Sequence, residues 1–419
     1  MTTTSSAARG PETGRSFTAL LTDRVFGWFF LANSLSNIGN WFQNVAAGIV
    51  VYDLTGSNTA VGLVSILQFS ATMLLTPWMG SLTDRVDRQR MLLVGQSIAF
   101  VGASALAVTV FTVGIDGLPG PWPIYAATAV IGFGAAVILP SLQAVVPALV
   151  DRADLDRAIT LNSMTFNIAR GVGPVAAGGV VAAFGAQWAF GINALTFLPL
   201  LVVLFLVSPR GEISPDPAAA GSVLDGLSWI RSRPAVTATI LATLVVGWTS
   251  DPFSTLMPAL ADDLGGGDAT VGLLVGAFGL GAAVTAPVTD PLRAWTGRSR
   301  FVPAGLAVVT VGLTGVALSP TTPLALTAAA VTGAGFLIGV TGTNSELQRA
   351  VPEELRGRVM AWWSVAFLGC RPLAALVDGA VADWLGVRVA IGVAASIAGT
   401  AAVVWGRRGL STDGVGVAA

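Results

Sequence analysis

Carboxyl groups inside long apolar runs are the residues of this sequence best suited to do chemistry. Asp251 lies near the middle of one run, in Trp248-Thr249-Ser250-Asp251-Pro252, and Glu346 lies near the end of another. A charged group at membrane depth costs roughly 2.5–3.5 kcal/mol even on lenient insertion scales, so such a residue is a functional hypothesis by default. Because desolvation favours the neutral form of a carboxyl group, Asp251 and Glu346 are our candidates for proton coupling.

Two arginines and a second aspartate lie at similar depth. Arg170 and Arg371 are each well inside an apolar run, and Asp378 follows Arg371 by two helical turns, on the same helix face. A buried guanidinium could attract anionic groups of a substrate. In the other interpretation, all these charges form buried ion pairs that fix helix register. That second interpretation fits Glu346 and Asp378 better, the arginines equally well and Asp251 less well.

Polar and aromatic side chains on other runs could complete an amphipathic cavity. The candidate cavity residues are Asn37, Trp41, Asn44, Asn167, Arg170, Trp248, Trp363 and Arg371. Each of them, taken singly, is equally consistent with ordinary packing or lipid contact. The chain has no His and a single Cys, Cys370, which leaves carboxylates as proton carriers and excludes a thiolate metal cluster. We predict no metal and no cofactor, with the proton gradient as the energy source.

The elements that position these residues must be membrane-spanning helices. Of 419 residues, 53% are hydrophobic and 11% charged, whereas a soluble domain carries about 25% charge. A helix that crosses a bilayer needs roughly 20 apolar residues, and the sequence has about twelve runs of that length. The predicted spans are 25–53, 58–82, 90–114, 121–150, 156–184, 186–208, 235–262, 268–290, 301–319, 322–350, 357–384 and 387–407.

The distribution of arginine sets the orientation of these spans. Arginines cluster before the first span, after every even-numbered span and after the last, whereas the opposite loops carry aspartates and one arginine, Arg388. Because basic residues stay on the cytoplasmic side, both termini are predicted to be cytoplasmic. Every basic residue is Arg, which is typical of a GC-rich bacterial genome, so the membrane is predicted to be a bacterial inner membrane.

The chain divides at a hydrophilic stretch near its midpoint. The predicted segments are a tail at 1–24, a six-helix bundle at 25–208, a cytoplasmic linker at 209–234, a second six-helix bundle at 235–407 and a tail at 408–419. The linker stretch is rich in Pro, Gly, Ser and Ala, which is typical of a connection between two bundles.

The two halves repeat each other at a distance of about 200–210 residues. Asp84 recurs as Asp290, and Arg170 recurs as Arg371. Chance matches of Ala and Gly are common in such a sequence, but matches of Asp and Arg are not. Six spans repeated in parallel orientation imply two bundles related by an axis along the membrane normal, with a substrate path between them. We therefore predict an all-α membrane protein of two pseudo-symmetric six-helix bundles.

The loop after the second span carries a charged motif, Gly80-Ser81-Leu82-Thr83-Asp84-Arg85-Val86-Asp87-Arg88-Gln89-Arg90. It resembles the G-x-x-x-D-R-x-G-R-R motif of the major facilitator superfamily, with Asp87 in place of a glycine. The resemblance implies the major facilitator fold and a latch that forms in one access state and breaks in the other. A solvated charged turn is the alternative. The residues assigned this conformational role are Gly80, Asp84, Arg85, Asp87, Arg88, Arg90 and Asp290.

The fifth span carries a second motif, Leu161-Asn162-Ser163-Met164-Thr165-Phe166-Asn167-Ile168-Ala169-Arg170-Gly171-Val172-Gly173-Pro174, followed by Gly178-Gly179. It resembles a stretch of the superfamily branch that holds enterobactin exporters and macrolide-efflux proteins. It is also similar to the antiporter motif G-P-x-x-G-G, although three residues separate Pro174 from Gly178. Glycine and proline permit close helix approach and a bend. The residues of this antiporter-like motif are Gly171, Gly173, Pro174, Gly178 and Gly179.

These resemblances cover nearly the whole chain and imply a secondary active transporter. The implied function is proton-coupled export of a small amphiphilic molecule, drug-like or a siderophore, by a monomer using alternating access. The alternative is an uptake symporter or facilitator, which sugar-type motifs after spans 6 and 12 would favour; neither motif is present. No nucleotide-binding loop or nucleophile elbow supports an enzyme. The net charge of −1 excludes a basis for nucleic-acid binding, so the predicted partners are the substrate and the lipid bilayer.

Overall fold

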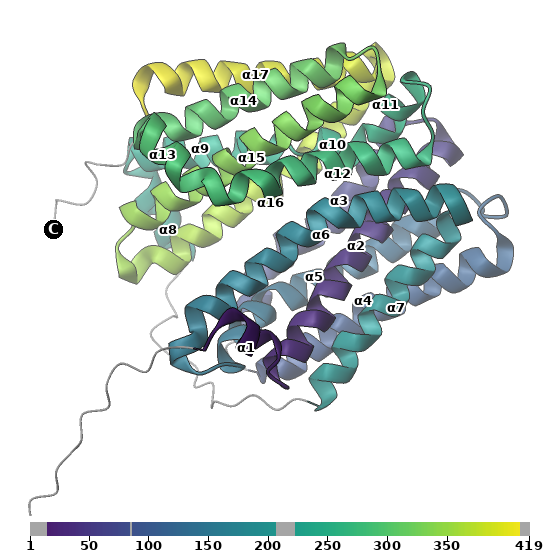
Figure 1. The fold of residues 1–419 in the computed structure, drawn as a ribbon, viewed down its shortest axis with the longest axis horizontal. Coiled ribbons are helices and arrows are strands. Elements are labelled where there is room, and N and C mark those ends of the chain that lie inside the picture. The colour runs from purple at the N-terminus through teal and green to yellow at the C-terminus, as the bar shows by residue number, and fades with distance from the viewer. Residues whose placement is uncertain (1–14, 84–85, 207–222, 411–419) are drawn as a thin grey trace, which may run out of the picture.

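The described part of the chain is built from helices. The computed structural model describes residues 15–83, 86–206 and 223–410, and within these ranges no β-strand occurs. Figure 1 shows one group of helices formed before residue 207 and another formed after residue 222. The two groups lie side by side, converge at one end of the molecule and diverge toward the other.

The first group consists of α1 (Phe17–Leu21), α2 (Phe26–Thr55), α3 (Asn58–Thr83), α4 (Arg88–Val113), α5 (Trp122–Ala148), η1 (Arg152–Asp154), α6 (Leu155–Phe184) and α7 (Ala186–Leu206). The second group consists of α8 (Val223–Arg231), α9 (Pro234–Trp248), α10 (Pro252–Thr255), α11 (Met257–Asp263), α12 (Asp268–Thr285), η3 (Ala286–Val288), α13 (Thr289–Thr296), α14 (Arg298–Leu318), α15 (Thr322–Ala350), α16 (Glu353–Leu385) and α17 (Val387–Arg408). Helix α8 lies within the predicted linker, 209–234.

Nine helices among the described residues are long and apolar enough to cross a membrane. Three predicted spans fall short of that standard: 25–53, 156–184 and 235–262. The first forms the long helix α2, whose polar residues lower its hydropathy. The second forms the long helix α6, of which the fully described part is the shorter apolar segment Ala169–Phe184. The third is divided into shorter helices.

The break in the predicted span 235–262 lies at Thr249–Asp251, between α9 and α10. Pro252 begins α10 and Pro258 lies in the first turn of α11, positions where proline's missing N–H disrupts no helical hydrogen bond. The hydroxyls of Thr249 and Ser250 donate to the carbonyls of Val246 and Gly247, at 2.8 Å each. These hydrogen bonds satisfy two carbonyl groups at the end of α9. The turn that follows contains Asp251.

Two helix pairs make the most extensive contacts between the two groups: α3 packs along α16, and α6 packs along α12. We call these contacts the α3–α16 seam and the α6–α12 seam. Helix α2 also contacts the short helices α10 and α11, and α3 also contacts α10. Glycines permit the close approach in both seams. A β-carbon built on Gly62 would lie 2.6 Å from the Ala375 carbonyl oxygen, and one built on Gly178 would lie 2.6 Å from the Cα of Gly272. Small residues at helix interfaces are the usual solution where lipid removes the hydrophobic drive for association.

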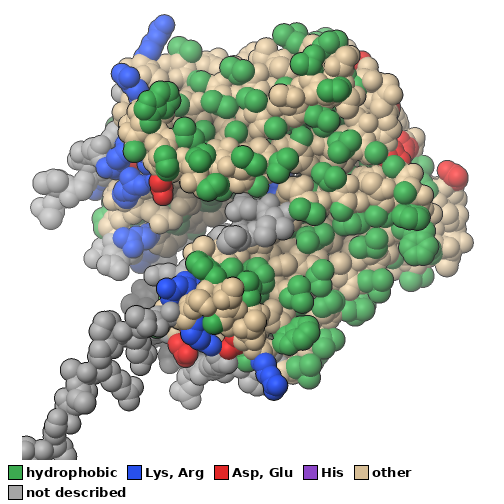
Figure 2. Space-filling view, in the orientation of Figure 1, with side chains coloured by type: hydrophobic (Ala, Val, Ile, Leu, Met, Phe, Trp, Pro, Cys, Tyr) green, Lys and Arg blue, Asp and Glu red, His purple; other side chains and the backbone are tan. Residues whose placement is uncertain are grey.

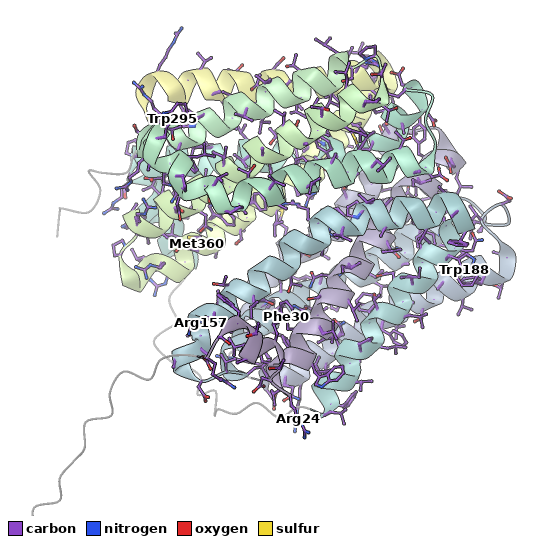
Figure 3. All side chains as sticks on the ribbon, in the orientation of Figure 1. Arg24, Phe30, Arg157, Trp188, Trp295 and Met360 are labelled. Carbon is purple, nitrogen blue, oxygen red and sulfur yellow. The ribbon has the colours of Figure 1, made fainter. Side chains whose placement is uncertain are left out.

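The molecule has two chemically different ends. The terminal end is where α2 begins and α17 ends; Figure 3 places Arg24 and Arg157 there and Trp188 at the opposite, far end. Basic side chains gather at the terminal end, and acidic ones mark the far end (Figure 2). Apolar side chains cover much of the surface between the two ends, as a lipid-facing surface requires.

An ion pair holds the start of the described chain at the terminal end. Arg15 Nε donates to Asp154 Oδ2 at 2.6 Å, and the Arg15 backbone N–H donates to Asp154 Oδ1. Burial raises the pKa of Asp154, but these bonds outweigh it and hold the net pKa below its ordinary value. The carboxylate is therefore charged at neutral pH.

Candidate functional site

Asp251 is fully buried in the turn between α9 and α10. Its Oδ2 accepts a hydrogen bond from Thr255 Oγ1 at 2.9 Å, whereas Oδ1 is buried without a partner among the described residues. Its main chain stays in the helical path, because the Ser254 N–H donates to the Asp251 carbonyl at 2.7 Å. A buried carboxylate with an unsatisfied oxygen is costly unless it binds a proton or a cation.

Arg371, on α16, is the cation that interacts with Asp251. The two groups attract each other electrostatically, without reaching salt-bridge distance. Arg371 Nη2 donates to Ser254 Oγ on α10 at 3.0 Å, and its guanidinium lies 4.2 Å from the ring centroid of Phe69 on α3. The structure thus brings Asp251 and Arg371 together beside the α3–α16 seam.

Arg170, on α6, has a different environment at the α6–α12 seam. Its guanidinium lies 4.7 Å from the ring centroid of Phe336 on α15 and 5.6 Å from that of Phe278 on α12. No salt bridge to Arg170 is found within the described ranges. A cation held only by aromatic faces keeps its positive charge available to a further partner.

The two arginines occupy equivalent positions in the two halves, and each one reaches an aromatic ring of the opposite half. Arg170 of the first half contacts Phe278 and Phe336, and Arg371 of the second half contacts Phe69. The sequence repeat therefore has a structural counterpart across the interface between the two groups of helices.

A row of aromatic rings extends through the second group of helices and includes the two rings that contact Arg170. It comprises Trp363, Phe367, Phe336, Phe278 and Phe253, whose neighbouring ring centroids lie 4.4–6.0 Å apart. The predicted cavity residue Trp363 also donates its indole N–H to Thr343 Oγ1 at 3.3 Å. The row gives Arg170 an apolar, polarisable surround.

The predicted cavity residue Trp248, at the end of α9, contacts a carboxylate rather than open space. Its Nε1 donates to Asp378 Oδ1 on α16 at 3.2 Å. Asp378 is 1% exposed, and its Oδ2 has no partner within the described ranges. Asp251 and Asp378 also interact electrostatically, so the two carboxylates belong to one cluster with Arg371.

The candidate cavity residues of α2 have different environments. Asn37 Nδ2 donates to the Asn33 carbonyl at 2.8 Å within the helix. A β-carbon on Gly173 would lie 2.7 Å from that of Trp41, so Trp41 packs directly on α6. Asn44 is half-buried. Asn167 lies in α6, but its side chain is outside what the structure describes.

The antiporter-like motif lies in α6, with Pro174 inside the helix. Gly173 and Gly178 admit Trp41 and Gly272 at distances that a side chain would prevent. Gly171 makes only ordinary contact with α12, and a β-carbon on Gly179 would meet nothing within 4 Å. Two of these glycines are therefore required by packing, and Gly179 is not.

Glu346 lies apart from the central cluster, near the terminal end of α15. It is 3% exposed, and its Oε1 lies 3.4 Å from Arg298 Nε and 3.7 Å from Arg349 Nη1. The carboxylate thus lies within ion-pair distance of two arginines. This environment suits a structural ion pair better than proton exchange.

The loop motif is described only in part, because Asp84 and Arg85 lie outside the described residues. Gly80 is in the last turn of α3. Asp87 caps α4, where its Oδ1 accepts from the backbone N–H groups of Gln89 at 2.9 Å and Arg90 at 3.1 Å. Capping explains why an aspartate can replace the usual glycine.

The remaining members of that motif lie at the terminal end. Arg88 begins α4, and its side chain is half-buried. The exposed Asp290 lies in α13 beside Arg293 Nη1, at 3.7 Å.

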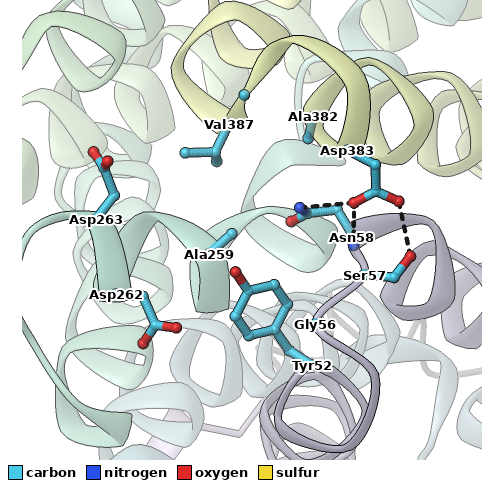
Figure 4. Close-up of a pocket in the computed structure, with 11 residues that line it drawn as sticks. Tyr52, Gly56, Ser57, Asn58, Ala259, Asp262, Asp263, Ala382, Asp383 and Val387 are labelled. Atoms are coloured by element: carbon cyan, nitrogen blue, oxygen red, sulfur yellow. Dashed lines mark hydrogen bonds between the residues drawn. The ribbon is translucent and has the colours of Figure 1, made fainter.

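A further contact between the two groups, which sequence reasoning missed, lies at the far end. Asp383 of α16 accepts hydrogen bonds from Ser57 Oγ at 2.8 Å and from the backbone N–H groups of Asn58 at 2.7 Å and Thr59 at 3.0 Å. It thereby caps α3 from the opposite half (Figure 4). The adjoining pocket, of about 730 Å³, is also lined by Tyr52 and Asp262.

Sequence reasoning also missed the uncharged partners of the arginines. Phe69, Ser254, Phe278 and Phe336 are common residue types in apolar runs, so nothing in their local sequence distinguishes them. Asp378 did have a signal, namely a carboxylate two turns from Arg371 in an apolar run, which we interpreted as a structural ion pair.

Known proteins similar to this chain are membrane transporters. A family described as transmembrane secretion effector matches residues 15–411. The enterobactin exporter EntS of Shigella boydii is 28% identical over 350 residues, which cover 82% of both chains. The Escherichia coli enterobactin exporter EntS is 27% identical with the same coverage.

Solved structures show the same fold at low sequence identity. The nucleoside transporter NupG has a TM-score of 0.77 at 11% identity and covers 91% of this chain and 98% of its own. A bacterial homologue of the lysosomal transporter Spinster, in an inward-facing conformation, has a TM-score of 0.73 at 12% identity, with coverage of 92% and 97%. A bacterial homologue of the iron transporter ferroportin, also inward-facing, has a TM-score of 0.70 at 16% identity, with coverage of 91% and 98%.

Proposed function

Because this chain belongs to the transmembrane secretion effector family of major facilitator transporters, we propose that it is a proton-coupled exporter of a small amphiphilic organic molecule. It is a multi-pass membrane transporter and not an enzyme. The similarity to enterobactin exporters favours a siderophore over a drug-like compound as the exported molecule.

The observation that carries the proposal is Asp251, a fully buried carboxyl group in a helix break at the interface between the two groups of helices. Broken helices at mid-membrane are where transporters bind coupling ions. Proton binding removes the charge of Asp251 and its attraction to Arg371. Because Arg371 also contacts Phe69 of α3, this change can reach the α3–α16 seam. A proton can thus bias one access state, which coupling requires.

The proposed architecture is that of twelve spans in two six-helix bundles, with α9, α10 and α11 together forming the seventh span. The terminal end is cytoplasmic in this proposal, because the arginines gather there. The contacts at Asp383 and at Gly178 close the far, periplasmic end, so the described conformation is the inward-facing one. The working unit is a monomer in a bacterial inner membrane, without a cofactor.

Alternating access follows from the two seams. Opening the periplasmic end requires Asp383 to leave the start of α3 and requires α6 to separate from α12 near Gly178. At the other end, we assign the loop motif that includes Asp87 to cytoplasmic contacts in the outward-facing state. A substrate bound beside Arg170 and Arg371 would then be exposed to each side in turn.

The test is substrate-dependent proton movement across inverted vesicles that contain the full chain. Enterobactin, a macrolide and a cationic dye are added in separate trials, and a pH-sensitive dye reports the gradient. We expect one of these probes to dissipate the gradient with the wild type and not with Asp251→Asn. Probe transport at the same rate with and without the proton gradient would overturn proton coupling. Proton-driven movement of the probe toward the cytoplasm would indicate uptake instead of export.

A further inference from the structure

Asp378 is a buried carboxyl group to which the proposed proton step assigns no role. It lies on α16, two helical turns from Arg371 toward the far end, and is 1% exposed. Trp248 Nε1 binds its Oδ1 at 3.2 Å, and its Oδ2 is buried without a partner within the described ranges. A carboxyl group with one satisfied oxygen is positioned to accept a proton at the other.

The electrostatic interactions place three charged groups in sequence. Arg371 interacts with Asp251, and Asp251 interacts with Asp378. Asp251 likewise has one oxygen without a partner. Since two neighbouring carboxylates repel each other, ionisation of both at once is unfavourable with a single adjacent cation. A proton held by the pair is therefore shared, and its position depends on which carboxylate has the better partner.

The far-end pocket begins about one helical turn beyond Asp378 on α16, where Ala382 lines it. Asp383 lies little more than one turn farther along α16 and lines that pocket together with Tyr52 and Asp262. From α9 and the turn after it, Asp378 faces Trp248 and Asp251. The α3 residues that pack against this part of α16 are the uncharged Asn58, Gly62 and Phe69, and on α17 Arg388 is paired with Asp263 at 2.6 Å.

We propose that Asp378 is a second proton-binding carboxylate of the transport cycle, which takes a proton from water in the far-end pocket and passes it to Asp251. This inference rests on the proposed function, since it assumes proton-driven export. The step transfers H⁺ only: Asp378 is neutralised by a proton from a hydronium ion, and it returns to a carboxylate when that proton moves to Asp251. Trp248 is the positioning residue, because its N–H holds one oxygen of Asp378.

The experiment separates proton coupling from substrate handling in proteoliposomes that contain the full chain, with enterobactin as the probe. One assay measures enterobactin accumulation driven by a pH gradient. The other measures enterobactin exchange at equal pH on both sides, which needs no net proton movement. The variants are Asp378→Asn, Asp378→Glu and Asp251→Asn, with Asp116→Asn as a matched far-end control.

We expect Asp378→Asn to lose gradient-driven accumulation roughly tenfold or more and to keep exchange. Asp378→Glu restores accumulation with a shifted pH profile, and Asp116→Asn behaves as the wild type. Wild-type accumulation by Asp378→Asn, beside its loss in Asp251→Asn, would overturn the role of Asp378 and leave the proposed function intact. No gradient-driven accumulation by the wild type would overturn the proposed function itself.

If Asp378→Asn fails in both assays, the variants Asp378→Glu and Trp248→Phe decide whether Asp378 binds a proton or is structural. If Asp378→Asn loses exchange as well and Asp378→Glu does not restore accumulation, Asp378 is structural and the inference fails. Trp248→Phe keeps the carboxylate and removes its hydrogen bond, so we expect the pH midpoint of accumulation to move upward while the exchange rate is unchanged. An unmoved midpoint would contradict the positioning role of Trp248 and the proton-binding role of Asp378.

Discussion

The two seams that join the halves are built from equivalent helices and yet differ in their chemistry. In the α3–α16 seam, Arg371 donates to Ser254 and attracts Asp251, and Asp383 caps α3. In the α6–α12 seam, Arg170 contacts only aromatic faces among the described residues, and Gly178 packs on Gly272. One seam is polar and hydrogen-bonded, and the other is apolar and closely packed.

This difference separates two tasks that a coupled transporter must perform. A polar seam with carboxylates responds to protonation, because the charge on Asp251 sets its attraction to Arg371, which contacts Phe69 of the opposite half. The apolar seam does not respond in that way. Its arginine, Arg170, has only aromatic contacts among the described residues, so it offers positive charge and aromatic surface to a substrate. We infer that the α3–α16 seam carries proton coupling and the α6–α12 seam carries substrate recognition.

The largest expected effect distinguishes the two arginines. Breaking a close buried ion pair costs about 3–5 kcal/mol, and we expect about 2–3 kcal/mol of stability loss for Arg371→Gln, since Asp251 is not within salt-bridge distance. Arg170→Gln loses aromatic contacts alone, about 1 kcal/mol. Thermal unfolding in detergent measures both. An equal loss in the two variants would contradict the difference between the seams.

Valine in place of a seam glycine is the next largest perturbation. Gly178→Val places atoms against Gly272, and overpacking of this kind costs about 1–3 kcal/mol. We expect it to force the far end open, which distances between spin labels on the two halves will report. Gly179→Val is the matched control, because a β-carbon there meets nothing within 4 Å. Identical distance distributions for the two variants would show that close packing does not hold this seam.

Removing the charge of Asp383 has a moderate expected effect. Asp383→Asn weakens the hydrogen bonds that cap α3, and because the site is exposed we expect a change of about 1 kcal/mol in favour of the outward-facing state. The accessibility of introduced far-end cysteines, in a background with Cys370 replaced, measures this change. Asp263→Asn serves as the control, since Asp263 pairs with Arg388 inside one half. A greater shift in the control would exclude Asp383 as a gate contact.

The smallest expected effect concerns the aromatic faces under the arginines. Phe69→Leu leaves Arg371 its hydrogen bond to Ser254, so we expect a stability loss of about 0.5 kcal/mol. Phe336→Leu leaves Arg170 with the more distant ring of Phe278 alone, and we expect about 1 kcal/mol. Thermal unfolding compares the pair directly. A larger loss for Phe69→Leu would mean that the hydrogen bond to Ser254 contributes little.

Most of the fold could be predicted from the sequence, because hydropathy is a local property. The predicted spans each overlap a helix or a run of helices, and the arginine-rich loops lie together at the terminal end. The predicted span 235–262 is not one continuous helix, because two prolines and the Thr249–Asp251 turn divide it.

The candidate site was predicted less completely. Asp251, Trp248 and Arg371 do lie in one cluster, whereas Glu346 lies apart from it beside Arg298 and Arg349. The functional roles of all these residues stay predictions. A single sequence reports how deep a charge lies, but it does not report which way each helix is rotated, and rotation decides which charges meet.

The sequence by itself determined that this chain is helical and membrane-spanning, that its halves repeat, and that Arg170 and Arg371 are equivalent. These properties follow from residue type and order along one chain. Only the tertiary structure decided that Asp378 meets Trp248, that Asp383 caps α3, and that the two arginines have different partners. Such contacts join residues more than 100 positions apart, and they depend on how whole helices pack against one another.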